Sequence, residues 1–104
     1  MTVPPRRGDV VWLSMDPVQG REQQGHHPHL VLSDERLALT MGLVIAVPMT
    51  SAPRPWATRV PLVKGSYAIG EQPRTFSVTR VTRIDRTGHD VQPVVDVIKH
   101  LIEN

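Results

Sequence analysis

The apolar residues of this chain occur in short runs, and this spacing limits what the chain can fold into. Three runs of strand length lie at 10–15, 30–33 and 43–48, each followed by proline, glycine or polar residues. Ten prolines are spread along the chain, and proline interrupts long helices. Weaker strands are expected at 58–62, where Pro61 favours a sheet edge, and at 71–78. The pattern predicts a mainly β (α+β) fold of short strands.

Only the C-terminal segment has a clear helical pattern. Its apolar residues recur at helical spacing and fall on one stripe: Val94, Ile98, Leu101 and Ile102. A shorter helical turn is expected over 35–39, and Gly65 and Gly70 are expected to bracket a turn. The chain has 104 residues and no internal repeat, so we expect one domain over residues 1–104.

Composition excludes several classes of protein. The chain has no cysteine, which rules out a disulfide framework and a thiolate zinc site. Three histidines lie close together at 26, 27 and 29, but their spacing matches no metal-binding pattern, and no metal or other cofactor is expected. The start of the sequence lacks a signal-peptide pattern, and no apolar run is long enough to span a membrane. We therefore expect a cytoplasmic protein.

The charged residues favour phosphate recognition only mildly. The formal net charge is +2, which alone does not indicate a nucleic-acid partner. Of the 12 basic residues apart from histidine, ten are arginine and two are lysine. Arginine presents a planar fork of donors that suits phosphate oxygens, although it also forms ordinary salt bridges on solvated surfaces. Both interpretations of the arginine content stay open at this point.

Three sequence blocks point to a known family. The first runs from G-D-V-V-W-L at 8–13, through D-P at 16–17 and the polar connection, to V-L-S at 31–33. The others are V-P-M-T-S at 47–51 and E-Q-P-R-T at 71–75. In order and spacing, these blocks resemble the MazF/PemK (ChpB-like) toxins, which are homodimeric endoribonucleases of toxin–antitoxin pairs. The resemblance extends from about Arg7 to the terminal helix.

This resemblance implies a fold and an activity. The fold is a small twisted antiparallel sheet closing into an SH3-like barrel of the CcdB/MazF type, with a C-terminal helix. The activity is sequence-selective, metal-independent cleavage of single-stranded RNA, including mRNA, in which the ribose 2′-OH attacks the adjacent phosphate. The products carry 2′,3′-cyclic phosphate and 5′-OH ends. A cognate antitoxin is the implied protein partner.

The resemblance also indicates catalytic candidates. The family pairs a catalytic arginine, directly before the proline of the first loop, with a threonine at the end of the buried strand. His27 and Thr50 occupy these places here. His27 has three interpretations. It is a general acid or base, a hydrogen-bond donor to the phosphate while an arginine elsewhere clamps that phosphate, or a surface-loop histidine in a catalytically weak relative. Glu22 matches an acidic position in the first loop of the family. It is interpreted as a proton acceptor, as a group that orients His27, or as a solvated carboxylate.

A second set of residues is expected to bind the substrate: Arg54, Trp56, Gln72, Arg74 and Arg80. Trp56 is suited to stack on a base or to pack against the fold or the antitoxin, whereas Trp12 is expected in the core. Arg74 is expected to contact RNA, to stabilise the dimer or to form an ordinary salt bridge. Two other functions remain open. One is a non-enzymatic barrel toxin that grips a protein target, as the sister CcdB toxins do. The other is a degenerate relative that binds RNA or antitoxin without cutting.

Overall fold

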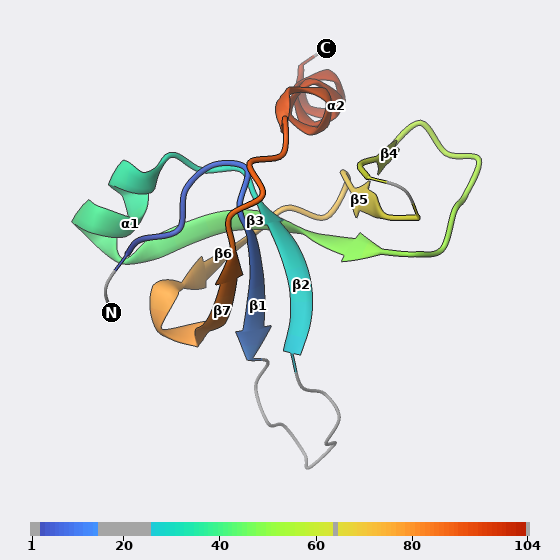
Figure 1. Ribbon diagram of the computed structural model, residues 1–104. Coiled ribbons are helices and arrows are strands. Elements are labelled where there is room, and N and C mark those ends of the chain that lie inside the picture. Colours follow the sequence, from blue (N-terminus) through green and yellow to red (C-terminus); the bar gives the residue numbers. More distant parts are fainter. Residues whose placement is uncertain (1–2, 15–25, 64, 104) are drawn as a thin grey trace, which may run out of the picture.

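The computed structural model describes residues 3–14, 26–63 and 65–103, and they form a strongly twisted antiparallel sheet with two helices (Figure 1). Within these residues, no helix is long and apolar enough to cross a membrane. The elements in chain order are β1 (Val10–Ser14), β2 (His26–Val31), α1 (Glu35–Met41), β3 (Leu43–Thr50), β4 (Arg59–Pro61), β5 (Tyr67–Ile69), β6 (Arg74–Ser77), the 3-10 turn η3 (Val78–Arg80), β7 (Val81–Asp85) and α2 (Gln92–Ile102).

Strand β3 organises the sheet. The strand order is β4-β5-β3-β2-β1-β7, and β6 also pairs with β3. One edge of β3 therefore takes β2, while the other takes β6 along its first half and β5 at its end. Pro61 lies in the outermost strand β4, which confirms its expected edge position. Among the described residues the pairing forms an open path, so closure into a barrel stays a prediction.

Both faces of the central strands are buried, because alternate side chains enter two separate cores. On β1, Val10 packs beneath α2, whereas Val11 and Leu13 pack on the other face. The helix-side core contains Val10, Leu30, Leu32, Val47, Val60, Ala68, Val91 and Val94. The second core, here called the inner core, contains Val11, Leu13, Val31, Val44 and Phe76.

Four strands differ from the sequence-based expectation. The segment 18–29 was expected to be a connection, but β2 already begins at His26, because Ser14 and His26 close an antiparallel pair with β1. The expected turn between Gly65 and Gly70 is wrong, since residues 67–69 form β5. The chain reverses before β5 instead, where the backbone of Leu62 and Ser66 is hydrogen-bonded. Strand β7 was not predicted, and the expected strand over 71–78 shortens to β6.

The two helices confirm the expected helical segments. Asp34 caps α1 by accepting the Arg36 N–H at 2.9 Å, and Gly42 ends it with a left-handed φ of 67°. Helix α2 begins at Gln92 with proline in its first turn and buries Val94. In Figure 1, α1 and α2 lie apart, and α2 stands above the end of the sheet where β1 begins.

The G-D pair at the start of the first sequence block fixes the beginning of β1. Gly8 has a φ of 94°, and a Cβ there would lie 2.6 Å from the His89 carbonyl oxygen. Asp9 is buried, and its Oδ2 accepts hydrogen bonds from Arg86 Nη1 at 2.7 Å and the Arg6 N–H at 2.8 Å. This buried ion pair ties the strand start to the segment that follows β7.

Candidate functional site

Strand alternation places the two catalytic candidates on the same face of the sheet. Strands β2 and β3 are antiparallel, and their pairing ends at His29 and Pro48, two residues short of His27 and Thr50. His27 pairs with Leu13 of the inner core, and alternation along β3 puts Thr50 on that same face. His27 is exposed and Thr50 is half-buried. The imidazole and the hydroxyl therefore lie on the face of the sheet that carries the inner core.

The backbone that follows Thr50 orients its hydroxyl. The Ala52 N–H donates a hydrogen bond to Thr50 Oγ1 at 3.1 Å. Because this bond occupies a lone pair, the hydroxyl proton of Thr50 can be donated outward. On the other side of β3, Thr50 pairs with Tyr67 of β5, so the phenol ring shares its face of the sheet. Sequence analysis did not single out Tyr67, because the strand that presents it was expected to be a turn.

Arg74 lies on the same face. It pairs with Ala46 of β3, and Ala46 pairs with Val31, a member of the inner core. The Arg74 side chain is exposed, and its guanidinium lies 5.2 Å from the centroid of the Phe76 ring. The structure therefore brings three of the predicted residues, His27, Thr50 and Arg74, onto one face. This group is called the polar face below.

Beneath the polar face lies a buried histidine that sequence analysis considered only as a metal candidate. His29 is 4% exposed, and its Nδ1 lies 3.1 Å from the His27 carbonyl oxygen. Its ring meets the Phe76 ring edge to face, with centroids 5.1 Å apart and an interplanar angle of 76°. Burial lowers the pKa of His29, and the nearby positive charges of His27 and Arg74 act in the same direction. The neutral imidazole is therefore favoured.

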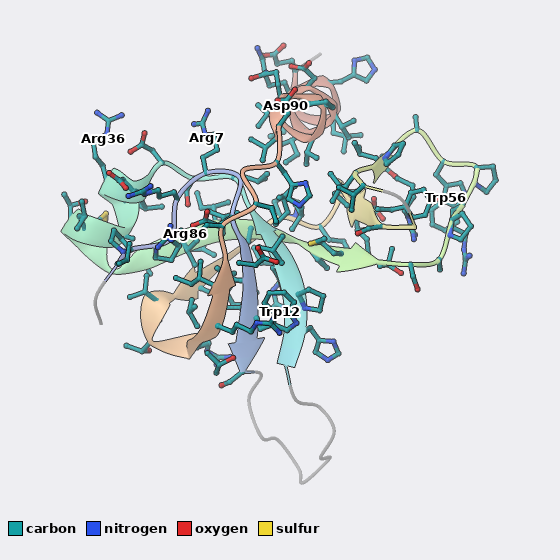
Figure 2. The ribbon with its side chains drawn as sticks, viewed as in Figure 1. Arg7, Trp12, Arg36, Trp56, Arg86 and Asp90 are labelled. Atoms are coloured by element: carbon teal, nitrogen blue, oxygen red, sulfur yellow. The ribbon has the colours of Figure 1, made fainter. Side chains whose placement is uncertain are left out.

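The loop between β3 and β4 presents an aromatic ring between two arginines. Trp56 is 52% exposed, with the guanidinium of Arg54 at 6.0 Å and that of Arg59 at 5.3 Å from its ring centroid. Arg59 Nη1 also donates to the Ala52 carbonyl oxygen at 2.8 Å. Figure 2 shows Trp56 on the outer loop, well away from Arg7 and Arg36. Sequence analysis proposed Arg54 and Trp56 but missed Arg59, which it read only as part of an edge strand.

Gln72 and Arg80 lie in the turns that precede and follow β6. Gln72 is exposed in the turn between β5 and β6, where its N–H donates to the Ile69 carbonyl oxygen. Arg80 donates to the Ser14 carbonyl oxygen at 3.1 Å and thus holds the end of β1. Glu22 lies outside the described residues. Trp12 is half-buried against the helix-side core, and Arg83 lies 4.3 Å from its ring centroid.

The polar face and the Trp56 loop are rich in basic groups and hydrogen-bond donors. Guanidinium groups bind phosphate oxygens, an imidazole can transfer a proton, and an exposed indole can stack on a base. Within the described ranges, no group of three or more His, Asp or Glu side chains could hold a metal ion. The polar face can therefore bind and polarise a phosphate group, and the Trp56 loop offers an exposed ring on which a base can stack.

Comparison with known proteins supports this chemistry at the level of the family. Residues 6–101 match the family described as PemK-like, MazF-like toxins of type II toxin–antitoxin systems. The chain therefore belongs to this toxin family. The endoribonuclease toxin MazF of Escherichia coli (strain K12) is 40% identical over 47 residues, which is 45% of this chain and 42% of that protein. The match thus spans less than half of that relative.

Solved structures of the family have the same fold. MazF of Deinococcus radiodurans superposes with a TM-score of 0.70 at 25% identity, covering 97% of this chain and 98% of that chain. The MazF-type chain in a MazE–MazF structure from the same organism gives a TM-score of 0.73 at 26% identity, covering 93% and 91%. The mainly β sheet with its C-terminal helix is therefore a MazF-like fold.

Proposed function

We propose that this chain is an endoribonuclease toxin that cuts single-stranded RNA without a metal ion. The observation that carries the proposal is strand alternation in the sheet, which puts His27, Thr50 and Arg74 on one face. Family membership and the endoribonuclease name of the Escherichia coli relative support it. We include in the proposal the closure of the sheet into an SH3-like barrel.

The proposed reaction needs two proton transfers and a site for charge on the phosphate. The 2′ oxygen attacks phosphorus and loses its proton, the bond from phosphorus to the 5′ oxygen breaks, and that oxygen gains a proton. His27 and Glu22 share the roles of base and acid. Arg74 and the Thr50 hydroxyl donate to the non-bridging oxygens, whose negative charge grows in the transition state. The products are a 2′,3′-cyclic phosphate and a 5′-OH.

Substrate binding is assigned to groups flanking the polar face. Trp56 stacks on a base, and Arg54 and Arg59 beside it face the RNA backbone. Gln72, in the turn between β5 and β6, and Arg80, in η3, are assigned to further substrate contacts. The exposed fraction of Trp56 supports stacking, because a ring that packed into the core would be buried.

We further propose that the toxin is a homodimer controlled by an antitoxin. A MazE–MazF structure among the similar proteins supports this regulation. The antitoxin is expected to place carboxylates on the polar face, where they compete with phosphate for the same arginines. Sedimentation should show a dimer at micromolar concentration, and an antitoxin complex should no longer admit RNA.

Cleavage of a single-stranded RNA in EDTA, with chemical analysis of the new ends, tests the proposal. We expect cyclic phosphate ends and unchanged activity in EDTA. Loss of activity in EDTA that zinc restores would overturn the metal-free mechanism. Intact RNA at high protein concentration would instead favour a relative that binds RNA, antitoxin or another protein without cutting.

A further inference from the structure

The buried histidine beneath the polar face has no role in the reaction proposed above. We propose that His29 is a positioning residue, whose Nδ1–H holds the carbonyl of His27 and thereby fixes the strand end that presents the His27 imidazole. This inference rests on the proposed function. It concerns a residue that neither touches RNA nor transfers a proton in that proposal.

The hydrogen bond defines the form of the imidazole. A carbonyl oxygen can only accept, so the Nδ1 atom 3.1 Å away must carry the proton. In a neutral ring, Nε2 is then an acceptor. The ring cannot easily turn, because it is 4% exposed and meets Phe76 at 5.1 Å. The Nδ1–H of His29 therefore donates a hydrogen bond to the backbone carbonyl of His27, two residues earlier in the chain.

The position of this hydrogen bond matters because the pairing of β2 with β3 ends there. The pairing of β2 with β3 ends at His29 and Pro48, while His27 pairs only with Leu13 of β1. Beyond His29, β2 is therefore paired on its β1 side and has no ladder to β3. The hydrogen bond from His29 to the His27 carbonyl supplies a fixed point at this place. It limits how far the strand end that carries the His27 imidazole can move.

Burial lowers the pKa of His29 most, the hydrogen bond to the His27 carbonyl raises it, and nearby charge lowers it further, so that the net shift favours the neutral ring. The charged or titratable groups that act on His29 are His27 on its own strand and Arg74 on β6, and both oppose a second positive charge there. The residues paired with it, Val11 on β1 and Pro48 on β3, are uncharged. Protonation of His29 would place a buried cation beside His27 and Arg74. The polar face should therefore lose its geometry in acid when His29 becomes protonated.

A measurement on the unaltered protein tests the first step without any activity. Nitrogen NMR of histidine side chains distinguishes an Nδ1–H ring from an Nε2–H ring. We expect the His29 signals to report the Nδ1–H form near neutral pH and to resist protonation until the pH is below the ordinary imidazole range. An Nε2–H ring, or a ring protonated at neutral pH, would overturn the proposal.

Two variants test the second step. His29→Asn retains an N–H close to the place of Nδ1, whereas His29→Phe retains the ring and loses the donor. With RNA, His29→Phe should lower kcat about two- to tenfold with KM nearly unchanged, the effect of one lost hydrogen bond. His29→Asn should recover most of this loss. Both variants should lack the acid-side inflection that we expect protonation of His29 to cause in the wild-type rate profile.

The results separate this proposal from the proposed function. If no form of the protein cuts RNA, the proposed function fails. The tautomer of His29 and the backbone NMR signals of His27 then still test the hydrogen bond between them. If the wild type cuts RNA and His29→Phe matches it in kcat and acid inflection, the positioning role is wrong. It is also wrong if His29→Asn is as impaired as His29→Phe, because the loss would then follow the ring and not the donor.

Discussion

Replacing Arg59 with alanine should loosen the loop that follows Thr50. The change removes a charged hydrogen bond to the Ala52 carbonyl, about 1.5–3 kcal/mol, and a cation–π contact with Trp56, about 0.5–1 kcal/mol. It also removes the buried Arg59 Nε, which lacks a hydrogen-bond partner among the described residues. Burying this atom costs the closed loop about 1–3 kcal/mol, and the variant regains that energy. The balance favours loop opening by about 1–2 kcal/mol, a factor of about 5 to 30.

Amide hydrogen exchange measures this opening directly. The Ala52 N–H is bonded to Thr50 Oγ1, so its exchange reports whether the loop keeps the Thr50 hydroxyl oriented. We expect it to speed up about 5- to 30-fold in Arg59→Ala. The Val31 N–H, which is bonded to the Asp9 carbonyl, should exchange at the wild-type rate.

Arg54→Ala is the matched control, since Arg54 stands over the same ring. Its guanidinium is farther from the Trp56 centroid, at 6.0 Å, and its hydrogen bond goes to the carbonyl of the adjacent Pro53. We expect almost no change in Ala52 exchange. The reasoning would be refuted if both variants sped up exchange equally, or if Arg59→Ala left it at the wild-type rate.

Three other predictions concern catalysis and stability. His27→Ala should reduce single-turnover cleavage about a hundredfold or more with RNA binding nearly unchanged, while His27→Arg should keep activity with a flatter pH profile; a neutral alanine variant would contradict the catalytic role. Arg86→Ala should lower the free energy of unfolding by about 2–4 kcal/mol because it strands a buried carboxylate, whereas Arg6→Ala, which breaks an exposed pair, should cost less than about 1 kcal/mol in urea unfolding. Burial lowers the pKa of His29 in the folded protein, so the unfolded chain binds that proton first as the pH falls; the wild type should therefore lose more stability than His29→Asn between about pH 7 and 5, and equal losses would contradict this.

The sequence predicted the parts of the fold that depend on local pattern. The apolar run at 43–48 is the core of β3, and the spacing of Val94 and Ile98 correctly indicated the terminal helix. These elements depend on periodicity within a single segment. Strand β7 escaped prediction because its residues, Val81–Asp85, are mostly polar or charged and become a strand only by pairing with β1. Such pairing is a tertiary effect that a single segment does not encode.

The candidate site was predictable where a sequence block marked it. His27, Thr50 and Arg74 lie in three separate blocks, and the sheet brings them onto one face. Arg59 and His29 were missed because their importance comes from a contact made in space. An arginine in an edge strand and a histidine in a polar stretch look like ordinary surface residues until the burial and the hydrogen bonds are known.

The pairing of β1 with β7 has a consequence for synthesis of the chain. Asp9 and Arg86 are 77 positions apart, and β1 is enclosed between β2 and β7 only when both have been made. A nascent chain that ends at β6 leaves one edge of β1 open and the Asp9 carboxylate without its guanidinium. Contacts between such distant positions form slowly, because a long loop must close first. During translation, the sheet that carries the polar face is therefore completed only after most of the chain has left the ribosome.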